Sequence, residues 1–275
     1  MQRSPIPSRA VHRFDSILRA LAIASGIPLV VVFTNFVLAR FSLGSADALA
    51  VDALGAAASL ALLAMAAAAL GREPIARRLG LGAGRLSAPI LAIGALGILG
   101  LSHAAETLLH WSGVPSPGLA RFDEALAGTP PAQLGLPLFA LAIGAACGEE
   151  LFFRGFLQRG LATVLGRSAA IALASVAFGA AHGDLAHAAA AALLGLYLGV
   201  LTDAADSIRV GILAHAANNT VALFGVTAQL QIPQGPLATP LSVVGGMTLA
   251  CVALWAVLRA VPERPFLQSP PGSAD

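Results

Sequence analysis

Residues 134–153, LGLPLFALAIGAACGEELFF, decide the fold class because they are apolar over about one bilayer thickness. A helix rises about 1.5 Å per residue, so about 20 apolar residues cross the roughly 30 Å hydrocarbon core of a membrane. Further apolar runs lie near residues 16–39, 53–70, 88–109, 168–182, 185–201, 208–230 and 237–258. The sequence therefore predicts an all-α fold, a polytopic transmembrane helix bundle of about eight spans.

The composition is that of a membrane protein. Of the 275 residues, 57% are hydrophobic and 11% are charged, with a mean hydropathy of +0.82. A soluble domain carries roughly 25% charged residues. The basic residues are all arginine and lie mainly between the apolar runs, without interleaved aromatic residues, so we expect no nucleic-acid partner. Cys147 and Cys251 lie inside apolar runs and belong to no metal-binding motif.

The arginines also predict the orientation of the spans. One side would hold the arginines of the N-terminal segment and of the loops within 71–87, 159–167 and 206–209, whereas the other side keeps only Arg40 and Arg121. Cytoplasmic loops carry the excess of positive charge. We therefore predict an integral protein of a bacterial inner membrane with both termini in the cytoplasm.

A single membrane-embedded domain is predicted over residues 1–260. Residues 261–275 are rich in Pro, Ser and Gly and are expected to form a disordered cytoplasmic tail. The longest stretch between spans, residues 111–131, is expected to be an extracytoplasmic loop with one short surface helix.

Polar side chains interrupt three of the apolar runs. They are Glu149, Glu150 and Arg154 in GEELFFRGF, His182 in FGAAH, and His215, Asn218 and Asn219 in HAANN. Ionisable groups are rare in lipid and usually face a cavity or a partner. Taken together, a carboxylate, two imidazoles and an amide on three helices are better explained by one shared site than by separate structural roles.

Helical spacing assigns partners within each run. Glu150 and Arg154 are four residues apart and can pair, which lowers the cost of burying both. Glu149 is rotated about 100° from Glu150 and must point elsewhere, with no local partner. The alternative is that these charges mark a wetted helix end. The polar residues of the remaining runs are read as structural, with Asp203 and Asp206 as helix caps.

At this point the pattern resembles a known family. EELFFR, Phe178 to His182 and His215 to Asn219 match, in order, the EExxxR, FxxxH and HxxxN motifs of the CAAX-protease and bacteriocin-processing (CPBP) family. This family is also called the Abi or type II CAAX prenyl endopeptidase family. The resemblance covers about residues 134–225.

The resemblance implies an intramembrane endopeptidase acting on a membrane-bound peptide or protein substrate in a lipid environment. Glu149 would be the catalytic carboxylate, and His182, His215 and Asn219 would complete the site. The supporting residues would be Glu150, Arg154, Phe178 and Asn218. From the residue types, Glu149 would activate water, His182 would orient it, and His215 and Asn219 would stabilise the oxyanion.

Two questions stay open at the sequence level. Glu149, His182 and His215 could hold a divalent metal such as zinc and leave a fourth position for water, but the same groups can work as a metal-free glutamate protease, which we favour slightly. The competing functions are a proton-coupled transporter and a non-proteolytic bacteriocin immunity factor. The sequence contains no inverted repeat of the kind found in many transporters, which argues against the first. The sequence predicts neither the substrate nor the oligomeric state.

Overall fold

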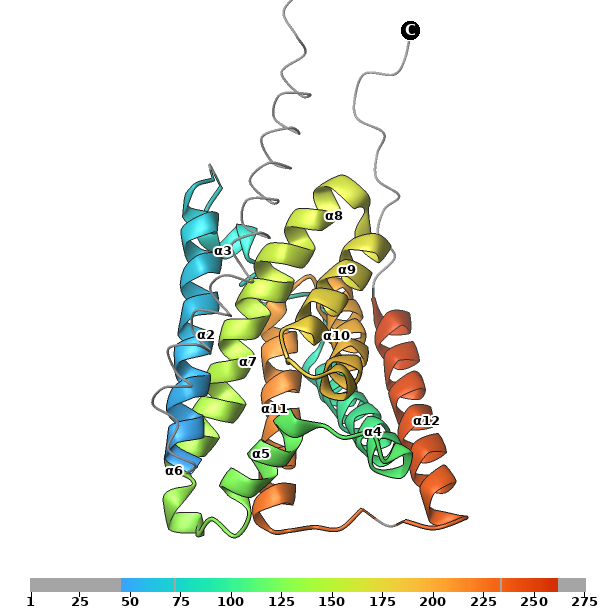
Figure 1. Ribbon diagram of the computed structural model, residues 1–275. Helices are drawn as coiled ribbons and strands as arrows, with labels where there is room; N and C mark the ends of the chain where they lie inside the picture. Colours follow the sequence, from blue (N-terminus) through green and yellow to red (C-terminus); the bar gives the residue numbers. More distant parts are fainter. Residues whose placement is uncertain (1–45, 72, 233, 262–275) are drawn as a thin grey trace, which may run out of the picture.

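The computed structural model describes residues 46–71, 73–232 and 234–261, and this part of the chain contains helices and no strand (Figure 1). The long helices are α2 (Ala46–Ala69), α4 (Ala88–Ser112), α9 (Arg167–Ala180), α10 (Leu185–Ala205), α11 (Ile208–Thr227) and α12 (Ala238–Ala260). A further continuous helix comprises α6 (Gly135–Pro137), the π-helix η2 (Leu138–Gly144), α7 (Ala145–Glu149), the π-helix η3 (Glu150–Gln158) and α8 (Arg159–Leu165). The shorter elements are α3 (Ile75–Arg78), α5 (Pro117–Leu126) and the 3₁₀ helix η1 (Pro131–Gln133).

Six of the helices in the described residues are long and apolar enough to cross a membrane. They confirm the predicted runs near 53–70, 88–109, 134–153, 185–201, 208–230 and 237–258. The first predicted span, residues 16–39, lies outside the described residues, as does nearly all of the predicted tail. The all-helical membrane fold is therefore confirmed, while the count of about eight spans is not, since the described residues contain six candidates. The helix α5 confirms the short helix expected within residues 111–131.

The helix that carries the paired glutamates is longer than the sequence predicted. It runs over Gly135–Leu165 rather than ending near residue 153, and it ends where Gly166 adopts a φ of +80°. Two π-helical segments flank α7, so the backbone hydrogen bonds skip one more residue there than in an α-helix. Such segments often occur at functional sites. Glu149 and Glu150 lie at the junction of α7 and η3.

The helix α9 is too short to span a bilayer. The sequence predicted a span over 168–182, but α9 has 14 residues, which is about 21 Å against roughly 30 Å of hydrocarbon. Its far end therefore lies within the bundle, where Gly183 has a φ of +91° and α10 begins (Figure 1). His182 lies on the turn after α9, within the bundle.

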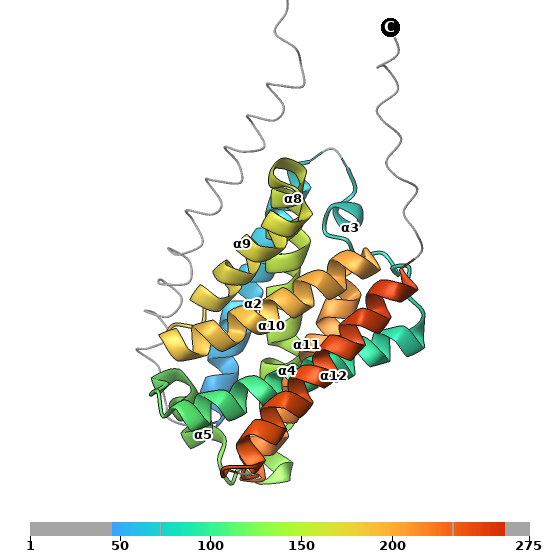
Figure 2. The ribbon, with the colours of Figure 1, turned by 90° about the vertical axis from the view of Figure 1, so that its right-hand side faces the viewer.

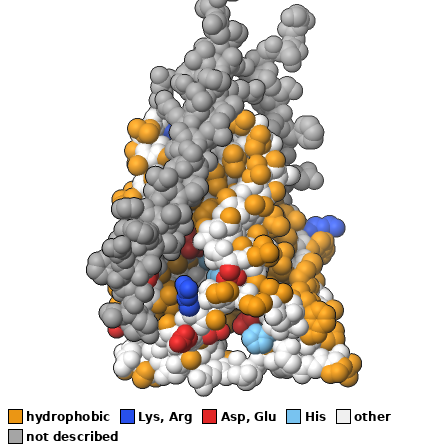
Figure 3. Space-filling model, viewed as in Figure 1, with side chains coloured by type: hydrophobic (Ala, Val, Ile, Leu, Met, Phe, Trp, Pro, Cys, Tyr) orange, Lys and Arg blue, Asp and Glu red, His pale blue; other side chains and the backbone are white. Residues whose placement is uncertain are grey.

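Small residues allow α4 and α12 to pack closely, and the two inclined helices cross in Figure 2. A Cβ added at Gly100 would lie 2.8 Å from the carbonyl oxygen of Gly246. Contacts of this kind drive association of helices in lipid, where burial of apolar surface gives no advantage. The outward-facing side chains are correspondingly apolar (Figure 3), and Leu62, Leu213 and Trp255 are each more than 60% exposed.

Candidate active site

Glu150 and Arg154 form a buried ion pair. Oε1 of Glu150 lies 2.9 Å from Nη1 of Arg154, and the two side chains are 0% and 1% exposed. Nη2 of Arg154 donates a hydrogen bond of 3.2 Å to the carbonyl oxygen of Gly195, and the guanidinium lies 4.3 Å from the ring centre of Phe178. The predicted pairing is confirmed. The alternative of a wetted helix end is wrong for these two residues because neither is in contact with solvent.

His215 connects both glutamates. Its Nδ1 is 3.1 Å from Oε1 of Glu150, and its Nε2 is 3.7 Å from Oε2 of Glu149. A carboxylate paired with Arg154 is a hydrogen-bond acceptor, so Nδ1 of His215 carries the hydrogen and donates it. In the neutral ring Nε2 then presents a lone pair toward Glu149. Sequence reasoning missed this second partner of Glu150, because the spacing i,i+4 reports contacts within one helix only.

His182 is held by the end of its own helix. Its Nδ1 is 2.8 Å from the carbonyl oxygen of Phe178, and since a carbonyl can only accept, Nδ1 donates. The Phe178 ring packs against the rings of both His182 and His215, with centroids 4.8 Å and 5.7 Å apart. The Phe178 ring therefore contacts both imidazoles, and its supporting role stays a prediction.

Asn219 is anchored to the helix that carries the glutamates. Its Nδ2 donates a hydrogen bond of 3.0 Å to the carbonyl oxygen of Leu141 in η2. Nδ2 of Asn218 is 3.5 Å from Oδ1 of Asn219. An amide nitrogen has two hydrogens, so one N–H group of Asn219 is available for another acceptor.

Two residues near the site were set aside or missed by sequence reasoning. The ring of His187 lies 4.7 Å from that of His182. Asp184 accepts hydrogen bonds from the hydroxyl of Ser116 at 3.0 Å and from the backbone N–H groups of Gly118 and His187 at 3.1 and 2.9 Å. The N–H of His187 in particular holds the pKa of Asp184 below its usual value. Asp184 therefore ties the start of α5 to the turn that bears His182.

The expected caps at the end of α10 are corrected. Ser207, not an aspartate, is the N-cap of α11. Asp206 is the left-handed C-cap residue of α10, with a φ of 54°, and its carboxylate pairs with Arg85 at 2.8 Å and Arg159 at 3.2 Å. Asp203 pairs with Arg167 at 3.5 Å. The sequence identified none of these three pairs, because the partners come from distant parts of the chain.

The candidate metal ligands do not form a metal site in this arrangement. Over the residues that the structure describes, no group of three or more His, Cys, Asp or Glu side chains is placed to hold a metal ion. Glu149 and His215 approach each other, but together with His182 they do not fit a three-ligand centre.

Residues 131–221 match the family model described as Type II CAAX prenyl endopeptidase Rce1-like. The family resemblance is confirmed over this segment. It covers about one third of the chain and contains all three motifs, from Glu149 to Asn219. No curated protein and no solved structure matches the chain. The chain is therefore an integral membrane protein, with six candidate spans in the described residues, of which residues 131–221 are similar to a CAAX endopeptidase family.

Proposed function

We propose that this protein is an intramembrane endopeptidase that hydrolyses a peptide bond of a membrane-associated protein or peptide. The observation that carries the proposal is the unbroken set of contacts from Arg154 through Glu150 and His215 to Glu149. All four residues lie in the segment that matches the endopeptidase family. A purely structural ion pair would not require an imidazole between two carboxylates inside an apolar bundle.

In the proposed mechanism Glu149 is the general base. Its side chain is 23% exposed, whereas Glu150 is fully buried, so Glu149 is the carboxylate that a water molecule can reach. Glu149 takes a proton from that water as the oxygen attacks the peptide carbonyl carbon. His182 orients the water through Nε2, which is an acceptor because Nδ1 donates to Phe178.

His215 and Asn219 are proposed to stabilise the oxyanion. Asn219 has one uncommitted N–H group. A neutral His215 has its only N–H directed at Glu150, so Nε2 can donate only after it receives a proton. Glu149 is its nearest source, with Oε2 at 3.7 Å. The proton taken from water would therefore reach Nε2, stabilise the tetrahedral intermediate, and return through Glu149 to the departing amine nitrogen.

We favour a metal-free glutamate protease with these roles. The metal-dependent alternative would need Glu149, His182 and His215 as ligands of a divalent ion such as zinc, and these side chains do not fit a three-ligand centre. The proposed steps depend only on Glu149, the two imidazoles and the Asn219 amide. We also propose that the chain lies in a bacterial inner membrane with both termini cytoplasmic, which the arginine distribution supports. Reporter fusions at Ser269 and within residues 115–124 should then report opposite sides.

The test compares all new peptide termini in membranes that contain the wild-type protein, Glu149→Gln or Glu106→Gln. Glu106 lies in α4 and is an exposed carboxylate outside the site, so it is a matched control for the same chemical change. We expect cleavage products that depend on the wild-type protein and on Glu106→Gln but disappear with Glu149→Gln. Identical termini in all three membranes would contradict the protease proposal and favour an immunity or carrier role.

A further inference from the structure

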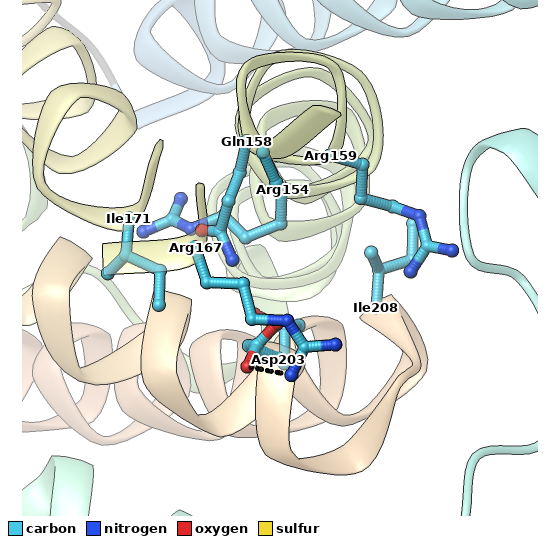
Figure 4. Close-up of a pocket in the computed structure, with 9 residues that line it drawn as sticks. Arg154, Gln158, Arg159, Arg167, Ile171, Asp203 and Ile208 are labelled. Atoms are coloured by element: carbon cyan, nitrogen blue, oxygen red, sulfur yellow. Dashed lines mark ion pairs between the residues drawn. The ribbon is translucent and has the colours of Figure 1, made fainter. Parts of the chain in front are cut away.

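A small hollow lies at the α8 end of the bundle, opposite the end that carries α5 (Figure 1). It is lined by Arg154, Gln158, Arg159, Ala162, Arg167, Ile171, Thr202, Asp203 and Ile208. Figure 4 shows Arg167 reaching toward Asp203 on α10, with Gln158 pointing into the space between α9 and α10. The proposed catalytic steps use neither this hollow nor its exposed arginines.

The hollow and the ion pairs around it carry a small excess of positive charge. Four guanidinium groups, those of Arg85, Arg154, Arg159 and Arg167, share the three carboxylates of Glu150, Asp203 and Asp206. The pairs that hold the outer arginines are exposed: Arg167 and Asp203 are 54% and 31% exposed, and Arg159 and Asp206 are 36% and 50% exposed. Exposed pairs of this kind contribute little in water, so an anion that offers better geometry can replace them.

The floor of the hollow contains a buried polar atom that lacks a partner. Gln158 is 5% exposed, and its Nε2 donates to the carbonyl oxygen of Gly199 at 3.0 Å. Among the described residues, however, Oε1 of Gln158 has no hydrogen-bond partner, whereas Nη1 of Arg154 faces Glu150 in the ion pair. Buried polar atoms nearly always have partners. The floor therefore offers one acceptor to a ligand that contains a hydroxyl group.

The residues around the hollow indicate that such a ligand is a lipid rather than a soluble molecule. Val164 and Leu165, next to Arg167 at the turn between α8 and α9, are apolar and are 42% and 49% exposed. Apolar side chains beside arginines at the ends of membrane helices lie at the level of the lipid headgroups. The anion most abundant there is the phosphate of a phospholipid. Arginine binds phosphate with two parallel hydrogen bonds, which makes it better suited than lysine to this ligand.

We propose that this hollow binds the headgroup of an anionic phospholipid, with Arg159 and Arg167 holding its phosphate diester and Gln158 accepting a headgroup hydroxyl. An anionic lipid is preferred because the ammonium group of a zwitterionic lipid would meet the excess positive charge of the lining. The shared chemistry with soluble ligands is the phosphate ester, so the experiment must separate lipid from free phosphate.

The site is connected to the catalytic residues through Arg154. Arg154 is one of the lining residues, and its Nη1 lies 2.9 Å from Oε1 of Glu150. The same oxygen of Glu150 accepts the Nδ1 hydrogen of His215. A phosphate beside Arg154 would compete with Glu150 for the guanidinium and shift the position of His215. Anionic lipid would then change the turnover rate. This coupling rests on the proposed function, whereas binding of the lipid does not.

The experiment measures thermal unfolding of the full-length protein in phosphatidylcholine nanodiscs with and without phosphatidylglycerol. A ligand that binds the folded state raises its melting temperature. We expect phosphatidylglycerol to raise the melting temperature of the wild-type protein. Arg167→Gln and Arg159→Gln should each reduce the apparent affinity about tenfold, which corresponds to one lost charge-assisted hydrogen bond.

Arg259→Gln is the matched control, since Arg259 lies at the end of α12 against Trp255 and outside the hollow. It should keep the full effect of phosphatidylglycerol, and Arg167→Lys, which retains the charge, should keep part of it. Equal losses in Arg259→Gln and Arg167→Gln would overturn the site in favour of general surface attraction. An equal stabilisation by inorganic phosphate or glycerol 1-phosphate in phosphatidylcholine alone would overturn the assignment to a lipid. Because the readout is unfolding, these results do not depend on whether the protein is a protease.

Discussion

Two groups of ion pairs in this molecule join a carboxylate to arginine, one in buried and one in exposed surroundings. Glu150 and Arg154 pair inside the bundle, where both are shielded from water. Asp206 pairs with Arg85 and Arg159 at the ends of the helices, where the three side chains are 50%, 33% and 36% exposed. Removing one member of a buried pair leaves an uncompensated charge in an apolar medium, whereas an exposed charge that loses its partner is solvated by water.

The same difference in burial separates two adjacent residues, Glu149 and Glu150. Glu149 directly precedes Glu150 in the sequence, yet it faces the other ring nitrogen of His215 and its side chain is partly exposed. In the proposed mechanism this difference in burial assigns proton transfer to Glu149 and support to Glu150. Four measurements test the contrast between the buried and the exposed pairs.

The largest effects are expected at the paired glutamates. Glu149→Gln keeps the shape but cannot accept a proton, so hydrolysis should fall by about 10²- to 10⁴-fold in a folded protein. Glu150→Gln leaves Arg154 without its counter-charge and should destabilise the protein by about 3–5 kcal/mol. Purified yield, melting temperature and proteolytic rate are measured for both variants. If Glu149→Gln stays active while Glu150→Gln is stable and inactive, the two roles are reversed.

A smaller effect is expected from crowding the buried carboxylate. A Cβ at Gly211 would lie 2.6 Å from Oε2 of Glu150 and 2.9 Å from Cγ2 of Thr202. Gly211→Ala should therefore cost about 1–3 kcal/mol through overpacking. Gly225, on the same helix, has no described atom within 4 Å of an added Cβ, so Gly225→Ala should be neutral or slightly stabilising. Chemical denaturation in matched detergent compares the two, and equal stabilities would show that Glu150 is not tightly packed.

The exposed group should tolerate loss of its charge. Asp206 has a φ of 54°, a conformation that asparagine adopts readily, so Asp206→Asn removes the charge without backbone strain. We expect a loss of about 1 kcal/mol or less that shrinks as salt is added. The check is the melting temperature of both proteins across a salt series. A loss as large as that of Glu150→Gln, or one insensitive to salt, would contradict the contrast between the two groups.

The smallest effect is a dependence on pH. Burial raises the pKa of Asp206, but the hydrogen bonds from Arg85 and Arg159 outweigh it and hold the pKa below the usual 3.8. A folded-state pKa below the unfolded value stabilises the protein above about pH 4, and the stabilisation is lost as the pH falls through the folded pKa. The stability difference between wild type and Asp206→Asn should therefore vanish at low pH. A difference that grows on acidification would have the wrong sign.

The sequence predicted the membrane helices because each apolar run is long enough to decide its own structure. It failed at two helix ends whose positions depend on packing against other helices. The end of α9 depends on a glycine turn and the packing of α10, which an all-apolar pattern does not reveal. The continuation of the glutamate helix to Leu165 depends on burial of Gln158 and Leu157 against other helices.

For the candidate site, the sequence identified the residues but only some of their partners. The pair Glu150–Arg154 followed from helical spacing, and the family from three ordered motifs. The bond from His215 to Glu150, the anchor of Asn219 on Leu141 and the cluster around Asp184 connect different helices. Such contacts depend on crossing angles and depths, for which one sequence contains no periodic signal.

The short α9 also determines how deep His182 lies in the bundle. Its length of about 21 Å, at a rise of about 1.5 Å per residue, sets the distance from the α8 end of the bundle to His182. An extended peptide advances about 3.3 Å per residue, so a chain entering from that end needs about six residues to reach the imidazole. One additional helical turn would shift that depth by about 5.4 Å, or close to two substrate residues. In the proposed protease, the length of α9 rather than the side chains of the substrate would then set the position of the scissile bond.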